Sequence, residues 1–495
     1  MVSQRVTMSG VAAVSTLLFV LVGCPTSPGG ADGGPDGLPD GRSIFFDAGN
    51  LDGGVASFVR VVHAARGAPA LDVSLNGVAT PVATNLAFAA ASGYLSVPAG
   101  LYDVIVKDHS QPGAAPLATA AQVRLSLGLR YTFVAAGVSG STDASNLFRV
   151  IPVPETFFPA SDQTARILFV HAVPDGVTYD MDLGDDGNRE VQGLARFNPT
   201  GGQGVEIEAT RTTLTVSGNP DGGFITAFDV PTLQSHGNYV LVLAGAQGVS
   251  ASDPTGLLLL GASADGTVFQ ADPLPTLVAF HAIADTAGID VFRKGKKVVD
   301  NLGYGQTAPA FFFPTDGGSE LDVILHQDGG HLAKVTAAGQ AVRTRSLGVV
   351  WGAAWSTASA PVSLSVLEEG FTVPTGTQAT LRVVNAIPDA PSVDFGTVTG
   401  TTLSTLAGFT AIASGAASDL IGAVQPVANT QFGVAKAKST SPLVSLAFNV
   451  PAGSEGFLIA LGFATPPAGA QPVTLIRVDV PLAVGVSWVA TPGAK

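Results

Sequence analysis

A histidine or asparagine followed by alanine, with an aspartate nine residues after it, occurs four times in this chain of 495 residues. The four pairs are His63 with Asp72, His171 with Asp180, His281 with Asp290, and Asn385 with Asp394. Imidazole and carboxylate groups carry general acid–base catalysis and bind metal ions. This signature is therefore the first candidate for a catalytic or metal site.

The fourth copy argues against chemistry at the shared position. Asn385 cannot exchange a proton near neutral pH and is a poor metal ligand. In the first copy, Val59 and Val61 share a strand face with His63, and an unpaired polar group at the end of a buried face costs about 1–3 kcal/mol. We therefore expect the histidines and Asn385 to bond the backbone or the aspartate and to hold the loop between two strands. No catalytic residue and no metal is expected at the signature.

The copies start 108, 110 and 104 residues apart, which indicates four modules of one kind. A second shared element supports this alignment, because a leucine followed closely by an aromatic residue begins at Leu86, Leu194, Leu302 and Leu406. The predicted domains are a signal peptide (1–23), a flexible Gly, Pro and Asp-rich tether (24–56), and modules at 57–157, 163–270, 273–371 and 375–490, the last divergent.

Each module reads as short strands separated by turns. In the first, 58–63, 71–75, 94–97, 101–106, 121–125 and 130–134 have strand patterns, and Asn76-Gly77 is a turn signal. The 60 glycines and 33 prolines also disfavour helices. The sequence predicts an all-β protein of tandem antiparallel β-sandwich modules, immunoglobulin-like in strand number. A β-propeller, with two blades from each module, is the alternative.

The first residues predict export. Arg5 precedes an apolar run at 11–22, which is shorter than the roughly 20 residues that span a bilayer. The following Leu21-Val-Gly-Cys24 resembles the lipobox of bacterial lipoproteins, and Cys24 is the only cysteine of the chain. We expect Cys24 to carry lipid and to anchor the protein in the cell envelope, at the outer membrane or cell surface rather than the inner membrane. The net charge of −14 disfavours nucleic acid as a partner.

The module openings resemble a known family. The residues that carry this resemblance are Arg60-Val-Val-His-Ala64 leading to Leu71-Asp72-Val73, and Arg382-Val-Val-Asn-Ala-Ile-Pro-Asp-Ala-Pro391 leading to Val393-Asp394. They resemble DUF 4397, a bacterial exported domain of unknown function, over most of residues 57 to 490, most clearly in the first and fourth modules. The resemblance implies a β-sandwich on secreted and lipid-anchored proteins, and it brings no catalytic residues.

Two further groups of residues are candidates for binding. Asp180, Asp182, Asp185 and Asp186 could converge on calcium, but their spacing fails the EF-hand pattern, and an acidic hairpin tip is expected instead. Trp351 and Trp355 would share a face of a strand at 347–355 and could stack on a sugar, although aromatic pairs in strands usually belong to the core. The run 311–313, three phenylalanines, is expected in the core.

The sequence contains none of the common hydrolase, zinc-protease, nucleotide-binding or dithiol motifs. We therefore expect a non-enzymatic, lipid-anchored protein without a cofactor, whose tandem modules serve adhesion, matrix contact or spacing. An extracellular polysaccharide or a surface protein is the expected partner. The alternative is a polysaccharide-acting or hydrolytic envelope enzyme with a site between modules.

Overall fold

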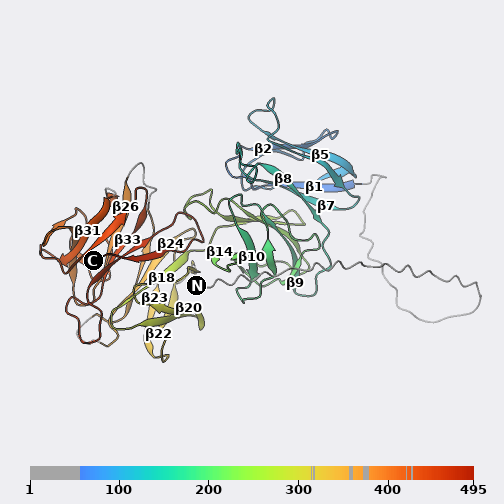
Figure 1. Ribbon diagram of the computed structural model, residues 1–495. Coiled ribbons are helices and arrows are strands. Elements are labelled where there is room, and N and C mark those ends of the chain that lie inside the picture. Colours follow the sequence, from blue (N-terminus) through green and yellow to red (C-terminus); the bar gives the residue numbers. More distant parts are fainter. Residues whose placement is uncertain are drawn as a thin grey trace, which may run out of the picture. The chain divides into compact units, whose positions relative to one another are not determined.

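The structure is a computed structural model that describes residues 56–494, apart from residues 314, 316–317, 356–359, 372–377, 420 and 425–426. All regular elements in the described part of the chain are β-strands (Figure 1). Strands 1 to 8 form module 1, strands 9 to 17 module 2, strands 18 to 25 module 3 and strands 26 to 35 module 4. The prediction of an all-β protein built from tandem sandwiches is confirmed.

The strand bounds are as follows. Module 1 contains β1 (Ala56–His63), β2 (Leu71–Leu75), β3 (Ala83–Leu86), β4 (Leu95–Pro98), β5 (Gly100–Asp108), β6 (Ala118–Leu125), β7 (Arg130–Ala136) and β8 (Arg149–Glu155). Module 2 contains β9 (Thr164–His171), β10 (Thr178–Leu183), β11 (Val191–Leu194), β12 (Val205–Glu208), β13 (Thr213–Asn219), β14 (Phe224–Asp229), β15 (Asn238–Ala244), β16 (Leu258–Ser263) and β17 (Val268–Ala271).

The second half continues in the same way. Module 3 contains β18 (Thr276–Ile283), β19 (Gly288–Arg293), β20 (Lys296–Gly303), β21 (Phe311–Phe312), β22 (Ser319–Leu325), β23 (His331–Ala337), β24 (Arg345–Gly352) and β25 (Ser363–Glu368). Module 4 contains β26 (Ala379–Ala386), β27 (Ser392–Thr399), β28 (Thr402–Thr405), β29 (Ile412–Ala413), β30 (Ile421–Val424), β31 (Val427–Lys436), β32 (Val444–Val450), β33 (Glu455–Leu461), β34 (Thr474–Asp479) and β35 (Val489–Pro492).

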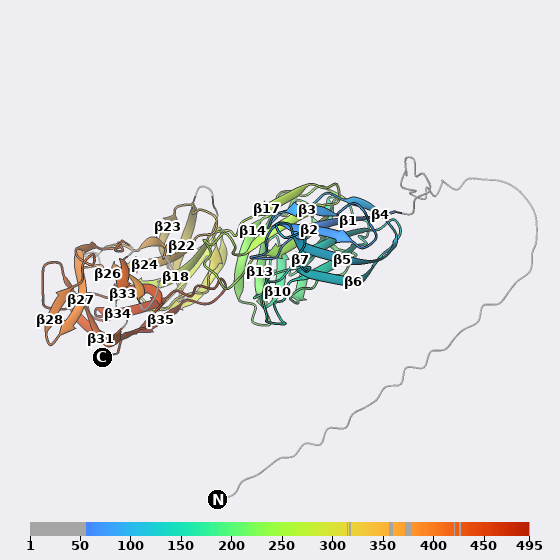
Figure 2. The same ribbon diagram turned by 90° about the horizontal axis from the view of Figure 1, so that it is seen from above.

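Each module consists of two sheets, which Figure 2 shows from above. In module 1 the sheets have the orders β4-β1-β7-β8 and β3-β2-β5-β6. Module 3 repeats this plan, and modules 2 and 4 repeat it with added strands. Side chains alternate between the two faces of a strand, so Val59 and Val61 of β1 enter the core between the sheets of module 1. This two-sheet closure excludes the β-propeller alternative.

The sandwiches are not purely antiparallel, which corrects the expectation. The first strand of each module pairs in parallel with a late strand, β1 with β7, β9 with β15, β18 with β24, and β26 with β33. Parallel pairing needs a long connection between the two strands. Here the whole second sheet lies in that connection, so the geometry permits it.

The modules also pack against one another in pairs. Val62 of β1 and the following Ala64 lie on the face opposite the module 1 core and join a cluster with Leu168 and Val170 of β9. Val278 and Phe280 of β18 pack in the same way against module 4. The strands at these two interfaces are buried on both faces, which explains why their sequences are almost continuously apolar.

A buried ion pair lies at each interface. Arg60 is 1% exposed, and it contacts Glu155 of its own module and donates to the carbonyls of Ala262 and Ser263 in module 2. Module 3 has an equivalent pair, in which Arg345 binds Glu369 and donates to carbonyls of module 4. Alternation along β1 places Arg60 on the face away from the module 1 core, and module 2 covers that face.

Candidate functional site

The signature histidines lie at the ends of the first strands of modules 1 to 3 and are fully buried. His63 accepts the N–H of Ala65 at Nδ1 (3.3 Å), which leaves the proton on Nε2, and Nε2 donates to the carbonyl of Pro69 (3.1 Å). His171 makes the same two bonds, from Val173 and to Val177. Each ring thus closes the loop that leads to the second strand of its module.

Asn385 of module 4 reproduces this geometry with an amide. Its Oδ1 accepts the N–H of Ile387 (3.1 Å), and its Nδ2 donates to the carbonyls of Ala390 and Ile412, both at 3.1 Å. A neutral imidazole with its proton on Nε2 offers the same acceptor and donor in similar positions. Asparagine can therefore replace histidine here because it makes equivalent hydrogen bonds.

Burial also sets the charge of the histidines. Desolvation lowers the pKa of His171 to about 4 and that of His281 to about 3, and it lowers the pKa of His63 as well. All three rings are therefore neutral at physiological pH. In His281 the donor Nε2 faces the hydroxyl of Thr286 at 3.2 Å instead of a carbonyl.

The signature aspartates do not meet the histidines. Each accepts an N–H from a residue with positive φ, which lies within the third strand in modules 1 to 3 and directly before β29 in module 4. The bonds join Asp72 to Asn85 (2.9 Å), Asp180 to Gly193 (2.8 Å), Asp290 to Asn301 (2.7 Å) and Asp394 to Ala411 (2.6 Å). Because left-handed backbone is otherwise costly, these carboxylates fix a turn in the second sheet. The two halves of the signature thus hold different loops.

A second aspartate, four residues after the histidine or asparagine, was missed in the sequence. Asp175, Asp285 and Asp389 each accept two successive N–H groups of a loop after the parallel partner strand. Gly67 occupies this position in module 1. The regular spacing in three copies was a signal that could have revealed it.

The four aspartates of the calcium candidate do not converge. Asp180 pairs with Arg189, and Asp185 pairs with Lys296. Asp180 and Asp182 lie two residues apart on one strand, which separates them by about 6–7 Å along the strand. The structure instead brings Asp182 and Asp186 together with Glu190.

A second acidic group, Asp290, Asp300 and His326, also has metal-binding atoms close together. However, the Nζ of Lys297 lies 2.7 Å from a carboxylate oxygen of both Asp290 and Asp300. This ammonium group lies between the two carboxylates and pairs with both. Lys297 and the two aspartates form an ion-pair network, and His326 bonds to Asp290.

The two tryptophans do not form the shared aromatic platform that their spacing suggested. Strand β24 ends at Gly352, so Trp351 and Trp355 do not share one strand face. Trp351 is 9% exposed and donates its Nε1–H to Ser365, whereas Trp355 is 66% exposed. In the phenylalanine run, Phe311 and Phe313 are buried in the core of module 3 and Phe312 is half-buried.

Trp355 lies instead at a polar cavity of about 370 Å³ that involves modules 3 and 4. Gln327 and Asp328 contribute from module 3, and Gln471 contributes from module 4. Asp285 accepts the N–H groups of Ala354 and Trp355 and so fixes the backbone beneath the indole. An exposed aromatic ring beside amide and carboxylate groups is suited to bind a polar ligand with apolar faces.

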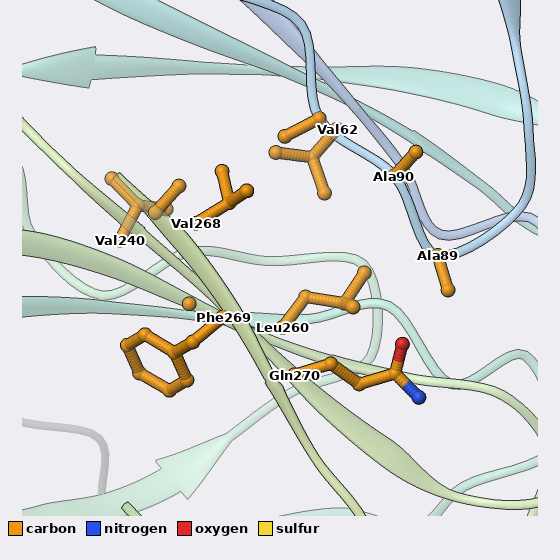
Figure 3. Close-up of a pocket in the computed structure, with 11 residues that line it drawn as sticks. Val62, Ala89, Ala90, Val240, Leu260, Val268, Phe269 and Gln270 are labelled. Atoms are coloured by element: carbon orange, nitrogen blue, oxygen red, sulfur yellow. The ribbon is translucent and has the colours of Figure 1, made fainter. Parts of the chain in front are cut away.

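An apolar cavity of about 310 Å³ lies between modules 1 and 2. Figure 3 shows Val62 and the adjacent alanines opposite Val240, Leu260 and Phe269, with Gln270 as the one labelled polar side chain. The ring of Phe269 lies over Gly261, where a Cβ would come within 2.1 Å of it. The cavity continues the apolar packing of the interface and lacks the converging polar groups that orient a ligand.

Cys24 and the rest of the predicted signal peptide and tether lie outside the described residues. The described residues contain no helix with the length and hydropathy that a membrane crossing needs.

Comparisons with known proteins define the family. The model of a domain of unknown function, DUF4397, matches residues 57–182 and 275–396, which together make half of the chain. Each match covers an odd-numbered module and the first two strands of the next. No curated protein matches the chain. Among solved structures, the Bacillus anthracis TIE protein is similar at 9% identity, with 82% of this chain and 67% of that chain covered and a TM-score of 0.12. The chain belongs to the DUF4397 family and contains the domain in tandem.

Proposed function

We propose that this protein is a non-enzymatic, lipid-anchored component of the cell envelope that contacts extracellular polysaccharide. Cys24 would hold the lipid, and the tandem modules would present a binding site away from the membrane. Adhesion or matrix contact is the use that this arrangement suits, because several weak contacts on one chain add as avidity. An outer-membrane or cell-surface position follows from the same proposal.

The observation that carries the proposal is Trp355. The indole of Trp355 is 66% exposed, the largest exposed fraction among the large apolar side chains of the described residues, and Asp285 holds its backbone in place. Sugar rings present C–H faces that stack on aromatic rings, and their hydroxyl groups need donors and acceptors such as Gln327, Asp328 and Gln471.

Intrinsic fluorescence provides a direct test, because Trp355 is the exposed member of three tryptophans while Trp351 and Trp488 are buried. Dextran, laminarin and chitooligosaccharides should be titrated into the mature chain. At least one should shift the emission, and Trp355→Ala should weaken its binding about tenfold, which corresponds to about 1.4 kcal/mol.

Phe158→Ala is the matched control, since Phe158 is an aromatic residue 50% exposed in another part of the chain. It should leave binding unchanged. A wild-type emission that none of the three carbohydrates moves would refute the polysaccharide proposal. The anchor is tested separately, because Cys24→Ala should release the protein from the membrane fraction.

One observation favours the enzyme as a second candidate. Glu455 of module 4 is 3% exposed, and neither oxygen of its carboxyl group has a hydrogen-bond partner. Burial raises its pKa, and the charge of Glu369 in module 3 adds to the shift. Two neighbouring carboxyl groups, one of them with a raised pKa, are the kind of arrangement that glycoside hydrolysis uses.

The surroundings of this pair make hydrolysis the weaker candidate. Arg345 holds both oxygens of Glu369, and Glu455 is buried where a substrate has no approach in the described structure. Release of reducing ends from the same carbohydrates, abolished by Glu455→Gln, would establish the enzyme. Absence of such release would leave binding as the function.

A further inference from the structure

We propose that module 2 binds a calcium ion at the turn between β10 and β11, through Asp182, Asp186 and Glu190. Carboxylate oxygens of these three residues lie within 4.8 Å of one another. Only module 2 has a carboxylate at the position of Asp182. The residues that stand there in the other modules, two after the signature aspartate, are Ser74, Phe292 and Gly396. The site is therefore not part of the common framework.

Arg211 shows that this turn surrounds a cation. Its Nη1 atom lies 2.6 Å from the carbonyl oxygen of Leu183, 2.9 Å from Asp186 Oδ2 and 3.1 Å from Glu190 Oε1. Three oxygens from different parts of the turn thus point to one cationic nitrogen. A calcium ion, which prefers oxygen ligands at 2.3–2.6 Å, would take the place of this nitrogen.

Asp182 supplies a ligand atom that Arg211 does not use. The residue is 8% exposed, and its Oδ2 accepts the N–H of Gly187 at 2.8 Å. Its Oδ1 is buried without a hydrogen-bond partner. A buried carboxylate oxygen without a hydrogen-bond partner is costly. Coordination to calcium would satisfy it.

The charge balance points the same way. Arg211 brings one positive charge to Asp186, Glu190 and the nearby Glu208, and Asp182 adds a further negative charge. The turn therefore holds excess negative charge that a divalent cation would neutralise, while Arg211 would keep Glu208 as its partner.

Calcium fits this ligand set better than zinc. All the available ligands are oxygens, from carboxylates and one carbonyl, and calcium completes its 6–8 ligands with water. Zinc prefers nitrogen and sulfur ligands. With part of the shell left to water, the dissociation constant should lie in the range of about 10⁻⁴–10⁻³ M that extracellular modules show.

The test is calorimetric titration of the chelator-treated mature chain with calcium chloride, with melting temperature as a second readout. Calcium should bind with a stoichiometry of one and raise the melting temperature of module 2. Asp182→Asn should weaken binding at least about tenfold. Arg211→Gln should strengthen binding, because it removes the competing cation.

Asp221→Asn is the matched control. Asp221 is exposed in module 2 and lies outside the cluster, so this variant removes the same charge without a proposed ligand. Its calcium affinity should equal that of the wild type. No binding up to about 10 mM calcium, equal weakening by Asp182→Asn and Asp221→Asn, or weaker binding in a folded Arg211→Gln protein would each overturn the proposal.

Discussion

Replacement of His63 separates a hydrogen-bonding role from a chemical one. His63→Asn keeps an acceptor for the N–H of Ala65 and a donor for the carbonyl of Pro69, as Asn385 does in module 4. His63→Ala removes both groups. We expect module 1 to tolerate asparagine and to be strongly destabilised by alanine.

The magnitudes follow from the contacts. Alanine leaves a donor and an acceptor unpaired in a fully buried site, at about 1–3 kcal/mol each, and it adds a cavity. The total loss should be about 3–5 kcal/mol. Asparagine keeps both hydrogen bonds but loses the edge contact between the imidazole ring and Phe88, whose ring centroids lie 5.9 Å apart. This contact is worth about 0.5–1.5 kcal/mol.

Hydrogen exchange detected by mass spectrometry is the suitable assay, because a chain of packed modules need not unfold in one step. Peptides that cover β1 and β2 report on module 1, and those that cover β26 and β27 serve as an internal control. Every 1.4 kcal/mol of lost local stability should accelerate exchange tenfold. Equal acceleration by asparagine and alanine would refute the hydrogen-bond explanation.

Three further predictions concern other parts of the fold. The pKa of His171 is about 4 in the folded state, below the unfolded value of 6.5. The contribution of the neutral ring to the free energy of unfolding is therefore complete above pH 6.5, and it falls by about 3 kcal/mol as the pH drops to 4. Hydrogen exchange measured during acid titration should show a smaller loss of stability in His171→Asn than in the wild type. Arg60→Met should cost about 3–5 kcal/mol, because it leaves the buried carboxylate of Glu155 with only the hydroxyl groups of Tyr94 and Thr132 as partners. Added Glu155→Gln should restore part of that stability in thermal denaturation. Gly462→Ala should destabilise module 4 by well over the roughly 1–2 kcal/mol that a left-handed backbone costs a residue with a Cβ, because this Cβ would lie 2.2 Å from the carbonyl oxygen of Pro472. Gly453→Ala is the control: Gly453 also has a positive φ but has open space around it, so this variant should show the backbone cost alone.

Much of the fold could be predicted because it rests on local patterns. The strand at 71–75 was predicted with the bounds of β2, and the predicted strand at 130–134 lies within β7. Strands β3 and β8 were not identified. β3 has only four residues, and β8 contains two prolines, which weaken the strand pattern.

The candidate sites were less predictable, because they depend on where strands end and on which residues meet in space. A strand that ends at Gly352 places Trp351 in the core and leaves Trp355 exposed. Glu190 joins Asp182 and Asp186 only because the β10–β11 turn folds back on itself. Its separation in sequence gave no reason to group it with them.

The sequence by itself determined the all-β class and the fourfold repeat, because strand periodicity and recurring spacing are properties of the chain. It also excluded proton chemistry as the common role of the signature, since Asn385 stands in one copy. Only the tertiary structure decided what covers the outer faces of β1 and β18, because the same apolar residues could face a partner module or another molecule. It likewise decided which polar groups satisfy one another, since hydrogen bonds between distant loops depend on positions in space and not on spacing along the chain.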